Sequence, residues 1–340
     1  MSRWIGTANQ GYAAYAVEEL RRLLGQLKVT QLAAGEVFMF ESPLSREETL
    51  EAVQRQLPIF LRHLQPVDRV IEASGNADDL EELSRGVRNA QLSFVDKQVS
   101  IHLRKAKVTV YPYSAADTKA VLDAVLEEIG AESARQSPDM IIAIYAAASQ
   151  LYVGCGTPVE MLSDWPGGAV RFQREEGQIS RAKFKLLEAE REFGLHYETF
   201  QQALDIGAAP GGWTSLLLER GLRVTAVDPG ELHPSLNGHP ALTYHKRNAS
   251  DVKLPAEAYD LLVCDMSWSP MQMSRLVLDL QQSLAREATA IITIKLMHRK
   301  PLQTIRDVSE RLSSAFTIER AKQLFHNRDE ITLYLKYRKA

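Results

Sequence analysis

Apolar positions in the first half of the chain follow two periods, one typical of helices and one of short strands. Helical periodicity covers residues 13–24, 46–56 and 116–129, while residues 36–40, 101–104, 108–110, 140–146 and 150–153 form strand-like apolar runs. This order predicts a small α+β unit over residues 1–60 and a second α+β unit over residues 61–172. Turn-forming residues then indicate a connecting segment: Pro158, Pro166, Gly167 and Gly168.

From residue 179 onward, strand and helix patterns alternate regularly. The predicted strands are 203–206, 223–227, 242–245, 261–264, 289–294, 317–322 and 331–337. Such alternation is typical of a doubly wound, mostly parallel sheet, so residues 173–340 are expected to form a Rossmann-like α/β domain. The short loop at 326–329 suggests that the last two strands are antiparallel, and ligand-binding residues are expected at the carboxyl ends of the parallel strands.

The run DIGAAPGGW, from Asp205 to Trp213, reads as a strand end, a glycine-rich turn and a helix start. The next predicted strand ends at Asp228, where a carboxylate can bind ribose hydroxyls. The turn lacks both the G-x-G-x-x-G pattern and a phosphate-loop lysine, which argues against a pyrophosphate ligand. S-adenosylmethionine fits better, and a tight turn without any ligand is the alternative.

Two charged residues close neighbouring predicted strands at the same edge of the sheet. Asp265 follows the run LLVC, and Lys295 closes ATAIITIK. We expect the two side chains to form a pair in which burial lowers the lysine pKa and the carboxylate opposes that change. A structural salt bridge between strand ends is the alternative interpretation.

Composition narrows the classes of protein that fit. The chain has 340 residues, 45% of them hydrophobic, and its two cysteines, Cys155 and Cys264, form neither a disulfide framework nor a zinc motif. The N-terminal sequence lacks a signal peptide pattern and the apolar run at 140–154 is interrupted, so we expect a cytoplasmic protein without membrane spans.

Charge is distributed unevenly along the chain, although the net charge is only −3. Residues 1–160 hold 16 basic and 21 acidic side chains, and the remainder holds 24 basic and 22 acidic ones. Basic residues recur within 171–185, 295–306 and 336–339. They could flank a phosphate backbone or simply be solvated helix faces.

Five motifs occur in the order found in one enzyme class. They are SRAKFKL (180–186), DIGAAPGGW, VCDMSW (263–268), TIKL (293–296) and RDEITLYL (328–335). Together they resemble the FtsJ/RrmJ class of RNA ribose 2′-O-methyltransferases. The resemblance implies a catalytic tetrad of Lys185, Asp265, Lys295 and Glu330, with S-adenosylmethionine as the cofactor.

The segments QLFHNRDEITLYLKYR, VCDM and LYVGCGTP resemble the bacterial 23S rRNA cytidine 2′-O-methyltransferases. In that family a THUMP RNA-binding domain and a smaller ferredoxin-like unit precede the catalytic domain. The segment PDMIIAIYAAASQLYVG looks like the closing strands of a THUMP domain. The resemblance therefore implies a THUMP-like domain at 61–172 and RNA, here 23S rRNA, as the partner, while the oligomeric state stays open.

The chemistry of methyl transfer to a ribose hydroxyl gives each tetrad residue a predicted role. The hydroxyl is a poor nucleophile, so a group must orient it and accept its proton. We expect Lys295 to do this, with Lys185 and Glu330 orienting the lysine and the ribose. No metal is required, because the sulfonium is already activated.

The resemblance also implies a set of cofactor-binding residues: Gly207, Pro210, Gly211, Gly212, Trp213, Asp228 and Asp265. One position departs from the usual pattern. Where relatives place an aspartate near the adenine, this chain has Asn248, and Asp251 is the competing candidate.

Three other functions remain open from the sequence. The protein could methylate tRNA or another RNA, act on a small molecule, or serve as a catalytically silent RNA-binding or assembly factor. The silent factor is disfavoured because all four tetrad residues are present. A small-molecule enzyme would explain neither the tetrad nor the long N-terminal half.

Overall fold

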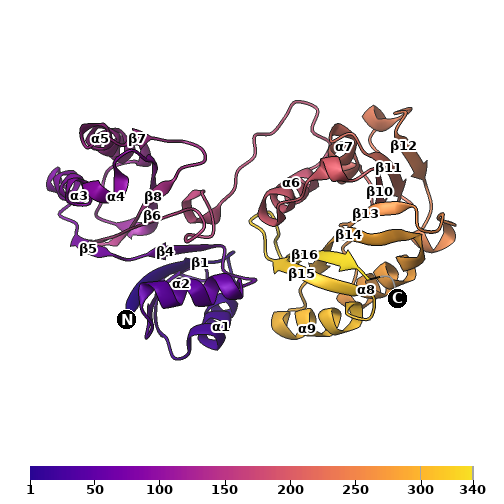
Figure 1. Cartoon of the computed structure of the whole chain (residues 1–340), viewed down its shortest axis with the longest axis horizontal. Coiled ribbons are helices and arrows are strands. Elements are labelled where there is room, and N and C mark those ends of the chain that lie inside the picture. Colours follow the sequence, from indigo (N-terminus) through magenta and orange to yellow (C-terminus); the bar gives the residue numbers. More distant parts are fainter. Residues whose placement is uncertain (299, 339–340) are drawn as a thin grey trace. The chain divides into compact units, whose positions relative to one another are not determined.

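The computed structural model describes residues 1–298 and 300–338 (Figure 1). Two compact units divide the chain, Met1–Val170 and the residues from Arg171 onward. Two basic residues of the predicted clusters, Arg299 and Lys339, lie outside the described residues. No helix among the described residues combines the length and the apolar character needed to cross a membrane.

The first sheet of the N-terminal unit is antiparallel, with strand order β2-β3-β1-β4. Its strands are β1 (Ser2–Thr7), β2 (Lys28–Ala33), β3 (Val37–Ser42) and β4 (His63–Pro66), and its helices are α1 (Ala13–Leu24) and α2 (Arg46–Arg55). Helix α1 buries Ala13, Ala16, Val17, Leu20 and Leu24, the spacing expected of one helical face. Because β4 pairs with β1, this sheet extends beyond residue 60.

The second sheet of the N-terminal unit has the order β5-β9-β8-β6-β7. Its strands are β5 (Arg69–Glu72), β6 (Gln98–Thr109), β7 (Glu132–Ser133), β8 (Met140–Ala148) and β9 (Gln150–Gly156). The helices of this part are α3 (Asp78–Asn89), α4 (Gln91–Phe94) and α5 (Ala115–Glu128). The two short strands predicted at 101–104 and 108–110 are one long strand, β6.

Gly167 and Gly168, in the predicted connecting segment, pack against the N-terminal unit. They form the short turn η1 (Pro166–Gly168), and both have positive φ angles, 63° and 67°. A Cβ on Gly167 would lie 2.5 Å from the Arg104 guanidinium, and one on Gly168 would lie 2.6 Å from Arg62. Both glycines are therefore required by close packing inside the N-terminal unit.

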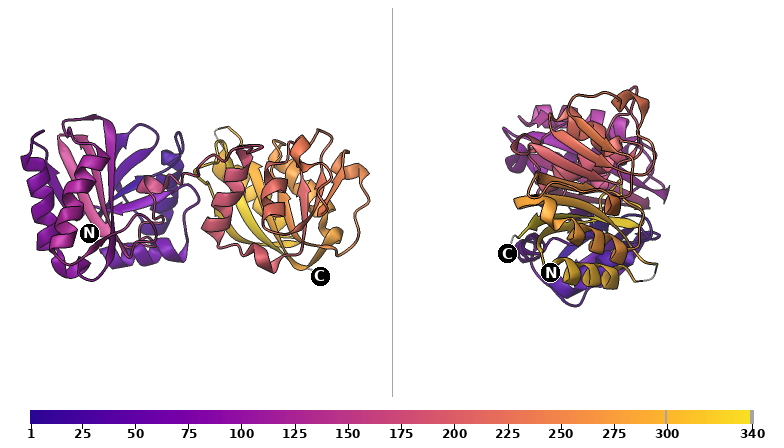
Figure 2. Two further views of the ribbon diagram at one scale, coloured as in Figure 1. Left: turned by 90° about the horizontal axis from the view of Figure 1, so that it is seen from above. Right: turned by 90° about the vertical axis from the view of Figure 1, so that its right-hand side faces the viewer.

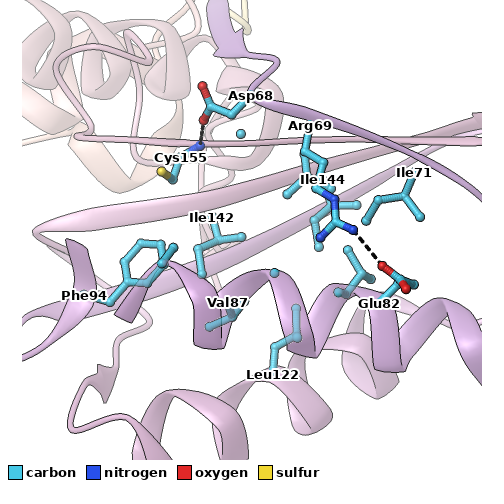
Figure 3. Close-up of a pocket in the computed structure, with 15 residues that line it drawn as sticks. Asp68, Arg69, Ile71, Glu82, Val87, Phe94, Leu122, Ile142, Ile144 and Cys155 are labelled. Atoms are coloured by element: carbon cyan, nitrogen blue, oxygen red, sulfur yellow. Dashed lines mark hydrogen bonds and ion pairs between the residues drawn. The ribbon is translucent and has the colours of Figure 1, made fainter. Parts of the chain in front are cut away.

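A cavity of about 120 Å³ lies between α3 and the second sheet (Figure 3). Its wall is mainly apolar and includes Val87, Leu122 and Ile144, while the ion pair between Arg69 and Glu82 lies at its edge. None of the site residues predicted from the sequence lines it. The cavity is therefore separate from the predicted chemistry.

The C-terminal unit contains one seven-stranded sheet with the order β12-β11-β10-β13-β14-β16-β15. The strands are β10 (Gln202–Ile206), β11 (Arg223–Val227), β12 (Leu242–His245), β13 (Tyr259–Cys264), β14 (Leu284–Lys295), β15 (Phe316–Lys322) and β16 (Glu330–Tyr337). Strands β10 to β14 are parallel, and β16 is antiparallel to both of its neighbours. This confirms the predicted Rossmann-like α/β domain and its antiparallel last pair of strands.

Helices cover both faces of this sheet, α6 and α7 on one face and α8 and α9 on the other (Figures 1 and 2). Their bounds are α6 (Ala182–Phe193), α7 (Gly212–Glu219), α8 (Pro270–Asp279) and α9 (Pro301–Leu312). Short 3₁₀ turns complete the unit: η2 (Tyr197–Thr199), η3 (Pro234–Leu236), η4 (Ala249–Asp251) and η5 (Gln281–Ser283). The sheet core is closed to solvent on both faces, which leaves the strand ends as the place for a site.

Candidate active site

Four predicted catalytic residues come from four separate elements of the C-terminal unit. Lys185 lies near the start of α6, Asp265 directly follows β13, Lys295 ends β14 and Glu330 begins β16. Strands β13 and β14 are parallel neighbours, and Lys295 is paired in register with Glu330. The sheet topology therefore brings these positions to its carboxyl edge.

Lys185 is the centre of the ion-pair cluster at this edge. Its Nζ donates to Asp265 Oδ1 at 3.0 Å and to Glu330 Oε2 at 2.7 Å. The three side chains are only 15–18% exposed. Asp265 thus pairs with Lys185, so the predicted pairing of Asp265 with Lys295 is wrong.

The cluster keeps Lys185 in its charged form. Burial works against the ammonium group, but attraction to Asp265 and Glu330 outweighs it and raises the pKa of Lys185 above its usual value. Two carboxylates face one ammonium, so the three groups together carry an excess negative charge. This excess negative charge attracts a positive group that lies beside the cluster.

Thr293 is a member of the site that the sequence did not identify. Its Oγ1 donates to Asp265 Oδ1 at 2.6 Å. Thr293 stands two residues before Lys295 on β14, so the two side chains leave the same face of the strand. That period-two spacing within TIK was the signal that could have found it.

Lys295 differs from Lys185 in its surroundings. Its side chain is exposed, and within residues 1–298 and 300–338 its Nζ has no hydrogen bond or ion pair. The amine therefore lies at the rim of the cluster rather than inside it. It can reach a ligand without breaking an existing contact.

The glycine turn has a backbone that larger residues could not adopt. Gly207 has a φ of 77°, and a Cβ there would lie 2.3 Å from Met266. Gly211 has a φ of 109°, and a Cβ there would lie 2.4 Å from Leu236. A cis peptide bond joins Ala209 to Pro210. Glycine at these positions lets the turn pack closely against Met266 and Leu236.

Asp228 connects the glycine turn to the loop after β11. Its Oδ2 accepts a hydrogen bond from the Ala209 N–H at 3.1 Å, and its Oδ1 accepts one from the Gly230 N–H at 2.6 Å. Each carboxylate oxygen retains a second lone pair for a ligand hydroxyl. The residues present therefore fit the ribose of S-adenosylmethionine.

The indole of Trp213 serves packing. Its side chain is 3% exposed, and its Nε1 donates to the carbonyl oxygen of Ala182 at 2.7 Å. Gly212 lies close to the same region, because a Cβ there would be 2.9 Å from Ser180. The predicted role of Trp213 in cofactor binding is not reflected in its side-chain contacts, which instead hold the start of α6, the helix of Lys185.

Asp205 is a buried acid beneath the site. Its side chain is 1% exposed, and the Thr214 hydroxyl donates to its Oδ2 at 2.6 Å. Burial raises the pKa of Asp205 to about 7, although the bond from Thr214 acts in the opposite direction. The sequence placed Asp205 in the glycine motif without showing that it would be buried.

The two candidates for the adenine contact lie together. Asn248 precedes the turn η4, and its Nδ2 donates to Asp251 Oδ2 at 3.3 Å. Both side chains are exposed. The geometry thus leaves Asn248 and Asp251 as a joint polar edge and does not select one of them.

Comparison with known proteins places this geometry in a family. Residues 178–313 match the FtsJ-like methyltransferase family. Three similar relatives are named ribosomal RNA large subunit methyltransferase M. The protein from Halorhodospira halophila is 38% identical over 51% of this chain and 51% of its own length. The one from Laribacter hongkongensis is 35% identical over 56% of this chain and 57% of its own length.

The third relative, from Aromatoleum aromaticum, is 30% identical over 94% of this chain and 89% of its own length. The chain therefore spans about half the length of the first two relatives and most of the third. These matches confirm the predicted methyltransferase class and S-adenosylmethionine as the cofactor. By sequence similarity along nearly its whole length, the chain belongs to the ribosomal RNA large subunit methyltransferase M family and contains an FtsJ-like methyltransferase domain.

Proposed function

We propose that the protein methylates the 2′-hydroxyl of a ribose in RNA, and that this ribose belongs to a cytidine of 23S rRNA. The observation that carries the proposal is the cluster of Lys185, Asp265 and Glu330 with exposed Lys295 at its rim. The names of the relatives support ribosomal RNA as the substrate. Bound S-adenosylmethionine would supply an activated methyl group.

In the proposed mechanism each residue of the tetrad has a separate role. Lys295 Nζ orients the ribose hydroxyl and, in its neutral form, accepts the proton released during attack. Lys185 remains charged and holds the Asp265 and Glu330 carboxylates in place. The excess negative charge of these carboxylates counters the positive charge that builds up on the ribose oxygen as it takes the methyl group, and Glu330, paired in register with Lys295, helps to orient that lysine.

The cofactor roles follow the geometry of the glycine turn. Gly207, Pro210, Gly211 and Gly212 shape the backbone against which the amino-acid end of the cofactor lies. Asp228 accepts hydrogen bonds from the ribose of the cofactor. Asn248 or Asp251 contacts the adenine amino group, since both accept hydrogen bonds at the exposed edge near η4.

The N-terminal unit is proposed to bind the RNA. The division into a small α+β unit at 1–60 and a THUMP-like RNA-binding domain at 61–172 stays a prediction, and β4 (His63–Pro66) of the first sheet lies beyond its boundary. The N-terminal unit contains none of the tetrad residues. Its contribution is therefore recruitment of the substrate rather than chemistry.

The test maps ribose methylations in 23S rRNA from cells with and without the gene. We expect one 2′-O-methylcytidine to disappear and to return with the wild-type gene but not with Lys295→Ala. Arg286→Ala is the matched control, because Arg286 is an exposed cation at the opposite end of the same strand, β14. If the 23S methylation pattern is unchanged and a tRNA methylation is lost, the substrate is tRNA and not rRNA. If Lys295→Ala restores the methylation fully, Lys295 does not accept the proton.

A further inference from the structure

Large apolar side chains are exposed at one place in the C-terminal unit. Among its described residues these are Trp268, Met271 and Met297, which are 43%, 40% and 51% exposed. Trp268 and Met271 follow β13, and Met297 follows β14. Since β13 and β14 are parallel neighbours, all three belong to the carboxyl edge that carries the tetrad.

These residues are close in sequence to the reacting groups. Trp268 stands three positions after Asp265, and Met297 stands two positions after Lys295. The strand ends fix where both segments begin. A molecule that brings its ribose hydroxyl to Lys295 therefore approaches the same edge of the sheet as these side chains.

The exposed tryptophan lies next to the start of α8. The start of α8 is capped by Ser269 and Gln272, which form a reciprocal capping box, and Pro270 occupies the first turn. Met273, Leu276 and Val277 of this helix are buried, and the Cys264 thiol contacts the Met273 sulfur at 3.5 Å. Trp268 directly precedes this cap and nevertheless remains 43% exposed, so part of its ring stays available to a ligand.

The charges around the surface favour a nucleic-acid occupant over a protein or lipid. Lys295, His298 and Lys300 are exposed in the segment that contains Met297. A planar nucleobase can stack on an indole, while the phosphates on either side of it are attracted to the flanking lysines. The combination of an aromatic face and nearby cations matches single-stranded RNA.

We propose that Trp268 is a stacking platform for an unpaired nucleobase of the substrate RNA, beside the ribose that receives the methyl group. This inference rests on the proposed function. Met271 and Met297 extend the apolar surface around the base. Because every base has a flat face, the platform positions the nucleotide and does not by itself select cytidine.

The kinetic test uses the full-length protein and an unmodified 23S rRNA transcript. Trp268→Ala should lower kcat/KM for the transcript by about 10-fold to 100-fold, the range expected for one lost stacking contact. Trp268→Phe should retain most of the activity, because a phenyl ring still stacks. The affinity for S-adenosylmethionine should be unchanged in both variants.

A second readout detects stacking directly. Trp4 and Trp213 are buried, at 1% and 3% exposure, so a Trp165→Phe background leaves Trp268 as the exposed indole. Addition of the transcript should quench the fluorescence of Trp268, and Trp268→Phe in that background should remove the quenching.

Two results would overturn the platform: unchanged kcat/KM in Trp268→Ala, or equal losses in the Ala and Phe variants accompanied by weaker cofactor binding. Failure of the proposed function gives a different result from failure of the stacking proposal. In that case the wild-type protein forms no 2′-O-methyl nucleotide in 23S rRNA, whereas fluorescence quenching by RNA still reports on Trp268.

Discussion

Two clusters of partly or fully buried cations, one in each unit, differ in the groups that surround the cation. In the C-terminal unit, Lys185 is held by the two carboxylates of Asp265 and Glu330. In the N-terminal unit, Arg62 and Arg104 lie mostly among neutral acceptors. The first cluster has negative charge to spare and an exposed lysine at its rim, while the second is enclosed.

The acceptors around Arg62 and Arg104 show a structural role. Arg62 donates to Asn9 Oδ1 at 2.6 Å, to the Gly167 carbonyl oxygen at 2.9 Å and to Glu36 at 3.2 Å. Arg104 donates to the Thr7 hydroxyl at 2.7 Å, and burial lowers the pKa of Arg104 to about 10. These contacts join β1, β6 and the turn η1 within one unit.

The difference between these two clusters lies in the charge that each presents to a ligand. The donors of Arg62 and Arg104 bond to acceptors of the same unit, which include Asn9, Thr7 and the Gly167 carbonyl oxygen. An excess of carboxylates beside an opening can stabilise charge that develops during a reaction. Substitutions in the two clusters should therefore alter different quantities.

The largest effect is expected for Lys185→Met. Methyl transfer should fall by at least about 10³-fold, equivalent to about 4 kcal/mol, because the Asp265 and Glu330 carboxylates lose the cation that holds them. Single-turnover methylation of 23S transcript measures this, with Arg286→Ala as the control. Near-normal turnover in Lys185→Met would make the cluster structural, like that of Arg62.

The next effect is on stability in the N-terminal unit. Arg62→Met should lower the free energy of unfolding of the N-terminal unit by about 2–4 kcal/mol, because Asn9, Glu36 and the Gly167 carbonyl lose a buried donor. Chemical denaturation followed through buried Trp4 measures this unit. Exposed Arg55→Met is the control and should change stability little, and cofactor affinity should stay normal in both. If Arg62→Met leaves stability unchanged but weakens cofactor binding, the Arg62 cluster has a functional role and not a structural one.

A smaller effect is expected for Asp228→Ala. The affinity for S-adenosylmethionine should fall by about 10-fold to 100-fold, because both the ribose acceptor and the hydrogen bonds to Ala209 and Gly230 are lost. Calorimetric titration measures the change, and Asp228→Asn should recover part of it. Equal affinity in wild type and Asp228→Ala would exclude the ribose contact.

The smallest effect near neutral pH is a pH dependence caused by Asp205. Its pKa in the folded protein, about 7, lies above the unfolded value of 3.8, so the folded state binds the extra proton and loses stability as pH rises from about 4 to about 7. Between about pH 6 and about pH 8 the loss is about 1 kcal/mol. Asp205→Asn should flatten this part of the stability profile. An identical slope in the variant would show that Asp205 is not the titrating group.

Much of the fold could be predicted from local patterns. The helix over Ala13–Leu24 and the strand over Arg223–Val227 have the predicted bounds, because each depends on side-chain periodicity within one segment. The strand Ser2–Thr7 was missed. Its burial depends on pairing with β3 and β4, which are remote in the sequence.

The sequence by itself determined which residue types stand at the strand ends and the glycine turn, because those signals are local. Only the tertiary structure decided that Asp265 binds Lys185, 80 positions away, and that Lys295 stays exposed at the rim. It also decided that Gly167 and Gly168 pack against two arginines. Charge pairing depends on distances of a few ångströms between distant segments, and those distances exist only after the chain has folded.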